Sequence, residues 1–185
     1  TDPQISSVVQ VYDALGNQRQ VTLNWWREDN DTWRLQIGTP GSTPAGPGHI
    51  AATVNFGGNV NPGPAAAPPG TITSITDLVN TTAPGAGPHL GGGPAALSFT
   101  VDYGFGAQPI ELRLGNWGTP TGLTNYAGTE FGIRDLAQDG VPLGAYSGVT
   151  VRENGDVAVN YDNGQTRIVA RVPVVAFNDP DRLQR

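Results

Sequence analysis

The chain from Asp139 to Leu183 reads DGVPLGAYSGVTVRENGDVAVNYDNGQTRIVARVPVVAFNDPDRL, and this stretch decides the fold class. It holds three runs rich in β-branched and aromatic residues, at Tyr146–Arg152, Val157–Tyr161 and Thr166–Phe177. Such residues favour strands, and the middle run alternates apolar and polar residues with the period of two of a half-buried strand. The stretch therefore predicts three short strands in succession.

Two Asn-Gly pairs separate these strands, at Asn154-Gly155 and Asn163-Gly164. Asn-Gly between alternating runs is the strongest short-range signal for a hairpin, because both central residues of a type I′ turn take positive φ. The sequence thus predicts an antiparallel meander closed by two such turns, with Gly155 and Gly164 at positive φ.

A second meander is predicted at the other end of the chain. Its strands are expected at Ser6–Tyr12, Gln18–Arg27 and Thr32–Gly38, separated by turns at Asp13–Asn17 and Glu28–Asp31. Each run alternates apolar and polar side chains, as strands with one buried face do. These three strands are expected to form an antiparallel sheet.

The middle of the chain alternates shorter strands with loops rich in Gly and Pro. Strands are predicted at Ile50–Phe56, Leu97–Tyr103, Ile110–Leu114 and Glu130–Leu136, whereas Thr71–Val79 fits either a strand or a short turn of helix. The 26 Gly and 16 Pro, with 14% charged residues, indicate many turns and little helix. The predicted fold is all-β: antiparallel meanders form a sandwich- or barrel-like domain, followed by a short second β region.

The charge and cysteine content exclude several kinds of partner and site. The net charge is −6, all ten basic residues are Arg, and these are dispersed along the chain. Nucleic acids and anionic membranes need clustered basic residues, so neither is expected as a partner. Without Cys, the chain offers neither disulfides nor thiolate ligands.

Residues that would form a catalytic or metal site are also lacking in the sequence. His49 and His89 lie in Gly/Pro loops without further ligands at a suitable spacing, and the acidic turns lack the spacing of a calcium loop. No paired acid and base, nucleophile elbow or phosphate loop is recognisable. We therefore expect no enzyme, no cofactor and no metal.

The tryptophans leave two interpretations open. Trp25 and Trp26 are adjacent on one predicted strand, so one of them must face away from the core. Trp33, on the next strand, is expected to pack across from one of them, and Trp117 lies in a loop. Either these side chains pack inside the protein, or Trp26 and Trp117 form an aromatic surface for a neighbouring subunit or a sugar.

Several short motifs resemble those of bacterial flagellar hook and rod proteins. The C-terminal motif comprises Gly140, Gly148, Asn154, Gly155, Asn163, Gly164, Phe177 and Pro180. A second block, Val11–Asn17 (VYDALGN), is similar to the start of the outer domain of hook proteins and contributes Tyr12, Asp13, Gly16 and Asn17. Rod proteins usually lack this second block, so the two together favour the hook proteins of this family.

The resemblance implies a structural subunit of the flagellar hook, the flexible tube that transmits torque from motor and rod to filament. Residues 1–136 would then be the outer domain, and residues 137–185 the returning meander of the inner domain or a meander packed on the first domain. The implied partners are copies of the subunit, rod proteins and hook–filament junction proteins, in an extracellular flagellum. The absence of heptads at either end predicts an internal piece of a longer subunit. The competing hypothesis is a carbohydrate-binding or adhesive β-sandwich at the cell surface.

Overall fold

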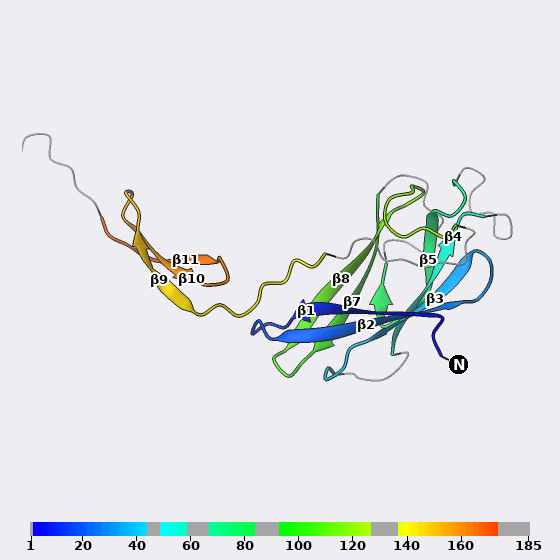
Figure 1. Cartoon of the computed structure of the whole chain (residues 1–185), viewed down its shortest axis with the longest axis horizontal. Coiled ribbons are helices and arrows are strands. Elements are labelled where there is room, and N and C mark those ends of the chain that lie inside the picture. The colour runs from blue at the N-terminus through cyan, green and yellow to red at the C-terminus, as the bar shows by residue number, and fades with distance from the viewer. Residues whose placement is uncertain (1, 44–48, 59–66, 84–92, 127–136, 174–185) are drawn as a thin grey trace, which may run out of the picture. The chain divides into compact units, whose positions relative to one another are not determined.

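The computed structural model describes residues 2–43, 49–58, 67–83, 93–126 and 137–173 (Figure 1). The chain divides into two compact units, Thr1–Gly140 and Val141–Arg185, and each is described by itself. In the described residues all regular structure is β-strand, arranged in three antiparallel sheets.

The first unit is built on a five-stranded sheet in which every strand pairs with its neighbours in sequence. Its strands are β1 (Ile5–Tyr12), β2 (Gln18–Arg27), β3 (Thr32–Gly38), β4 (Ile50–Phe56) and β5 (Ile72–Val79). The register places Val21, Leu23 and Trp25 of β2 on one face, and all three are buried. The opposite face carries Thr22, Asn24 and Trp26, as the alternation of the sequence predicts.

A three-stranded sheet provides the second layer of this unit. Its strands are β6 (Thr81–Thr82), β7 (Pro94–Asp102) and β8 (Ala107–Asn116), in that order. Alternate residues of β7 are again buried: Leu97, Phe99 and Val101 face inward, and Leu114 of β8 joins them.

Side chains from both sheets form one hydrophobic core. The most deeply buried members come from β3, β4 and β5 on one side and from β7 on the other, namely Leu35, Ile37, Ile50, Val54, Ile72, Ile75, Leu97 and Val101. Two sheets that share their inner faces make a β-sandwich. The predicted all-β, sandwich-like fold is confirmed, and neither sheet closes into a barrel in the described residues.

The second unit contains a single three-stranded meander, drawn in yellow to orange in Figure 1. Strands β9 (Tyr146–Val151), β10 (Asp156–Tyr161) and β11 (Thr166–Arg171) pair in the order β11-β10-β9. Within its described residues Ala158 is the only apolar side chain that is fully buried. A sheet with so little buried surface depends on further contacts for its stability.

The hairpin turns differ from the expected type I′. In each case the glycine alone has positive φ, at 84° for Gly155 and 81° for Gly164, whereas the preceding Asn does not. Gly155 N–H donates to Arg152 O and Arg152 N–H donates to Asp156 O, both at 2.9 Å. This is a type I turn followed by a glycine bulge. The Asn side chain stabilises it instead, because Asn154 Oδ1 accepts from Asp156 N–H at 3.1 Å.

The element bounds agree closely with those expected, with a few differences. Thr71–Val79, whose sequence fits either a strand or a short turn of helix, contains strand β5, and β6 lies in a segment that the sequence predicts as a loop. Strand β11 ends at Arg171, earlier than the predicted Phe177. The predicted strand at Glu130–Leu136, together with Phe177 and Pro180, lies outside the described residues.

Candidate assembly surface

The block Val11–Asn17 forms the turn between β1 and β2, and Asp13 organises it. Asp13 Oδ1 accepts the backbone N–H groups of Leu15 and Asn17, each at 2.9 Å. Gly16 has a φ of 77° and donates its N–H to Asp13 O at 2.8 Å. This turn is of the same type as those at Gly155 and Gly164. The motif residues therefore fix a backbone shape.

Asp13 also connects the two sheets through Arg19 and Tyr103. Arg19 Nε and Nη2 both lie 2.9 Å from Asp13 Oδ2, and Arg19 Cζ lies 4.9 Å from the centre of the Tyr103 ring. Burial raises the pKa of Asp13, but hydrogen bonds from Asn17, Arg19 and Leu15 outweigh this and hold the pKa below its ordinary value. Burial raises the pKa of Tyr103.

A second turn anchored by an aspartate lies beside this contact, between β7 and β8. Asp102 Oδ1 accepts the N–H groups of Gly104 at 2.7 Å and Gly106 at 3.1 Å. The backbone of Asp102 also pairs with Thr43 through two hydrogen bonds of 2.7 and 3.2 Å. Between the two glycines, Phe105 is 52% exposed.

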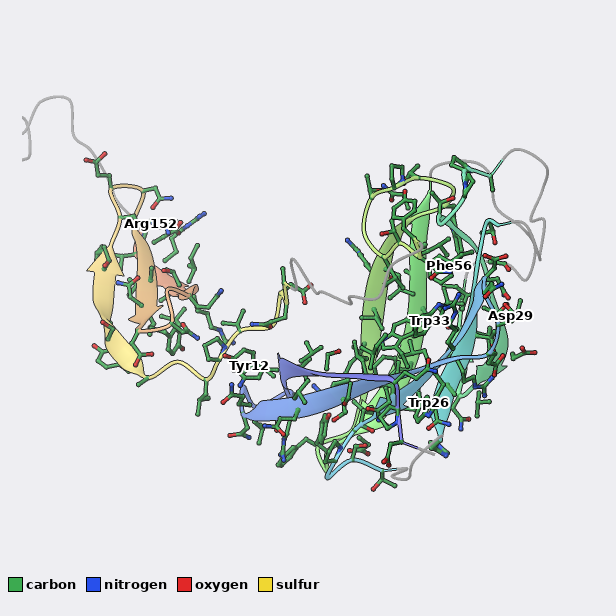
Figure 2. The ribbon with its side chains drawn as sticks, turned by 45° about the vertical axis from the view of Figure 1, so that its right-hand side comes forward. Tyr12, Trp26, Asp29, Trp33, Phe56 and Arg152 are labelled. Carbon is green, nitrogen blue, oxygen red and sulfur yellow. The ribbon has the colours of Figure 1, made fainter. Side chains whose placement is uncertain are left out.

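The four tryptophans do not form an aromatic surface. Trp25 and Trp117 belong to the buried core, and Trp117 is only 4% exposed, so its predicted role as a subunit contact does not agree with its position. Trp33 lies opposite Arg27 rather than opposite Trp25 or Trp26. Trp26 is half-buried on the outward face of β2, opposite Arg34 (Figure 2). Of the two candidate contacts, Trp26 alone remains at the surface.

Other motif residues lie in the second unit, where they fix the meander. Asn163 Oδ1 accepts from Gln165 N–H at 3.0 Å, and Asn163 Nδ2 donates to Pro142 O at 2.7 Å. Asp156 pairs with Arg171 at 2.5 Å, and this hydrogen bond, followed by that from Asn154, lowers the pKa of Asp156. Gly148 lies in β9, where a Cβ would meet no atom within 4 Å, and Gly140 lies at the end of the first unit.

One face of the meander carries a row of valines. The register pairs Val149 with Val159 and Val151 with Val157, which places these four side chains on one face. Val149 is 52% and Val151 63% exposed, while Val157 and Val159 are half-buried. Apolar side chains gathered in this way form an exposed apolar patch, a feature common at contact surfaces.

The described residues lack a cluster of metal-binding side chains. They contain no group of three His, Cys, Asp or Glu side chains able to hold a metal ion. A groove of about 680 Å³ beside β7 is lined by residues that include Thr43, His49, Phe99 and Asp102. His49 contacts Asn80 at 3.0 Å there. Among all the residues that the structure describes, no helix is long and apolar enough to cross a membrane.

Sequence reasoning found the motif turns but missed the residues that join them. The contact of Arg19 with Tyr103 joins residues that are distant in sequence, and Phe105 matches no motif. Two repeated signals could have drawn attention to them: an Asp opens both DALGN (Asp13–Asn17) and DYGFG (Asp102–Gly106), and each stretch places an apolar residue beside glycine. Such a pattern predicts a turn held by its own carboxylate.

The geometry defines a class of protein: a structural β-sandwich domain with an appended β-meander, whose motif residues hold turns in place. The chain belongs to the family described as flagellar basal body protein FlaE D2 domain, whose family model matches residues 3–141. The resemblance to flagellar hook and rod proteins is thereby confirmed.

The chain is also similar to curated proteins named flagellar hook protein FlgE. The chain is 23% identical over 197 residues to a protein of Caulobacter vibrioides named flagellar hook protein FlgE, covering 98% of this chain and 32% of that protein. It is 29% identical over 100 residues to the flagellar hook proteins FlgE of Brucella abortus and Brucella melitensis, covering 54% of this chain and 23% of those proteins. The chain thus spans about a third or less of the relatives it matches.

Proposed function

We propose that this chain is part of a structural subunit of the bacterial flagellar hook. The observation that carries the proposal is the family match over residues 3–141, together with relatives named flagellar hook protein FlgE. The arrangement of the motif residues supports it, because Asp13, Asn154 and Asn163 each accept a hydrogen bond that stabilises a turn of the backbone. No catalytic role is proposed.

Such a subunit acts by assembling with copies of itself into a tube. A contact that joins two different patches on neighbouring copies, without closing into a ring, generates a helical array. The contacts between outer domains must be weak and exchangeable if the tube is to bend while it turns. Rod proteins and hook–filament junction proteins are the further partners, and the flagellum outside the cell is the location.

The two units fit different places in this subunit. We assign residues 1–136 to the outer domain and residues 137–185 to the returning part of the inner domain. The exposed face around Val149 and Val151 supports this assignment, because a meander with one buried apolar side chain in its described residues needs a cover. The chain spans 32% of the Caulobacter relative, so a whole subunit of similar length has many further residues that can cover this face.

Immunogold electron microscopy tests the proposed function directly. Antibodies raised against this chain are applied to flagellated cells of the source organism, and cells lacking the gene serve as the control. Label confined to the short curved segment between cell surface and filament is expected. Label spread over the cell surface, or absent from flagella, would contradict the proposal and favour the adhesive alternative.

A further inference from the structure

Two neighbouring turns of the sandwich display apolar side chains from backbones that are held rigid. Leu15, at the tip of the β1–β2 turn, is 48% exposed, and Phe105, at the tip of the β7–β8 turn, is 52% exposed. Both turns belong to the first unit. We call these two turns, residues 13–17 and 102–106, the paired tips.

The same device builds both tips. An aspartate opens each turn and accepts two backbone N–H groups on one carboxylate oxygen: Asp13 Oδ1 from Leu15 and Asn17, and Asp102 Oδ1 from Gly104 and Gly106. Hydrogen bonds to an ionised carboxylate are among the stronger ones in proteins. The loops are therefore restrained, and the apolar side chains are held outward at a low entropic cost for later contacts.

Arg19 locks the tips to one another. Its guanidinium pairs with Asp13 of the first tip and lies 4.9 Å from the centre of the Tyr103 ring, within the second. Tyr103 is itself buried in the core, so the second tip is fixed to the sandwich beneath it. Arg19 therefore joins the two tips into one continuous surface of the first unit.

The composition of the paired tips fits contact with a copy of the same chain. Residues 14–16 and 104–106 are uncharged, and the carboxylates that open the turns are occupied by hydrogen bonds. Because the chain carries a net charge of −6, two copies repel each other unless they meet through neutral or paired surfaces. Rigid aromatic side chains are also enriched among residues that carry most of the binding energy of interfaces.

The size of this surface fits a contact that forms only within an array. The exposed parts of Leu15 and Phe105 amount to on the order of 200 Å² of apolar surface. Stable pairs of proteins bury about 1,200 Å² or more, so this patch alone supports no dimer. Repeated many times along a polymer, weak contacts of this size add up through their high effective concentration.

We propose that the paired tips are a contact surface between neighbouring copies of the subunit, with Phe105 and Leu15 as its apolar anchors. This inference rests on the proposed hook function and specifies where the outer domains touch. It replaces Trp117, which is buried, as the expected aromatic contact.

Polymerisation of the whole subunit tests the inference. Phe105→Ser and Leu15→Ser are expected to raise the critical concentration for polymer formation, measured by sedimentation, at least about fivefold, because each removes an anchor. Val8→Ser is the matched control: Val8 is 54% exposed on the outward face of β1, away from the tips, and its loss should change the critical concentration less than twofold. Melting temperatures of the three variants should agree with that of the parent, since none of these side chains is buried.

Photo-crosslinking identifies the molecule that contacts the paired tips. With p-benzoylphenylalanine in place of Phe105, illumination of the polymer should produce a crosslink between two copies that dilute subunits do not form. A crosslink confined to a single chain, or unchanged critical concentrations for both serine variants, would overturn the inference. A parent subunit that does not polymerise would instead contradict the proposed function, which separates the two failures.

Discussion

At the scale of single residues, glycine and its neighbouring carboxamide or carboxylate control the hairpins. Gly16, Gly155 and Gly164 all occupy the left-handed region, with φ between 77° and 84°. In each turn the side chain of an Asp or Asn one to three residues earlier accepts backbone N–H groups. One turn design thus serves both units of the chain.

Replacing a turn glycine should destabilise the meander. Gly155→Val and Gly164→Val place a β-branched residue at positive φ, and each is expected to cost roughly 1 kcal/mol or more. The measurement is the temperature at which amide NMR signals of β10 disappear. Gly148→Val is the control, because a side chain at Gly148 meets nothing within 4 Å and its φ is not positive. Unchanged temperatures for both turn variants would mean that these glycines do not hold the turns.

Stability should fall at low pH through Asp13. Its pKa in the folded protein lies below the ordinary value of 3.8, so its contribution is fully present above about pH 4 and is lost as the pH falls through the lowered pKa. Asp13→Asn should therefore lower the melting temperature at pH 7 and flatten its decline below pH 4. Asp2→Asn, which removes the same charge from an exposed side chain, is the control. An equally steep decline in Asp13→Asn would assign the acid sensitivity to other groups.

At the scale of elements, the segment after β8 closes one side of the sandwich. Leu123 N–H donates to Leu114 O at 2.6 Å. Asn125 N–H donates to the O atom of Gly70, which precedes β5, at 2.9 Å. The side chain of Asn125 then reaches the β2–β3 turn and strand β3: it donates to Asn30 O at 2.8 Å and accepts from Trp33 Nε1 at 3.3 Å. One side chain thus ties together three parts of the first unit.

Asn125→Ala should measurably weaken the first unit. The loss of two side-chain hydrogen bonds is expected to lower the free energy of unfolding by roughly 1–3 kcal/mol. Urea unfolding followed by tryptophan fluorescence reports this unit alone, because all four tryptophans lie in it. Asn24→Ala, which loses one exposed hydrogen bond to Ser6, should change the free energy by no more than about 0.5 kcal/mol. If the two substitutions lowered the free energy of unfolding equally, the hydrogen bonds of Asn125 would not be important for the stability of the first unit.

The sequence predicts elements well where one face of a strand is buried. Val21, Leu23 and Trp25 alternate with polar residues, and both the limits of β2 and its buried face follow from that pattern. The two residues of β6 offer no such pattern, since β6 exists through its pairing with Phe99 and Ser98 of β7. The burial of Trp117 likewise depends on contacts that no local pattern records. The candidate surface is predicted least well, because the contact between its two turns joins Arg19 to Tyr103, far away in sequence.

At the scale of the whole molecule, the two units differ in how much of their apolar surface they bury. The sandwich encloses residues such as Leu35 and Val54 completely, whereas Ala158 is the sole fully buried apolar residue described in the meander. The sandwich therefore has a core of its own, whereas the described part of the meander encloses almost no apolar side chain.

Hydrogen exchange should separate the two units. In this 185-residue chain, amides of β10 are expected to exchange at least about tenfold faster than those of β3 and β4, because local opening costs less where little surface is buried. Mass spectrometry after deuterium labelling measures both in one sample, with β3 and β4 as the internal reference. In the whole subunit the protection of β10 should rise if its valine face is covered. Equal protection in the isolated chain would show that the meander is stable by itself.

The order of the strands also bears on how the protein reaches its fold. Sheet order follows chain order, β1 to β5 in one layer and β6 to β8 in the other, so most pairings join segments that are close in sequence. Short loops close at a small entropic cost, and chains with local pairings fold faster than β-proteins with crossed topologies. The domain can form hairpin by hairpin as each strand becomes available, because few strands need a partner from a distant part of the chain. If the chain serves the hook function proposed above, the speed of folding need not limit the speed at which the tube grows.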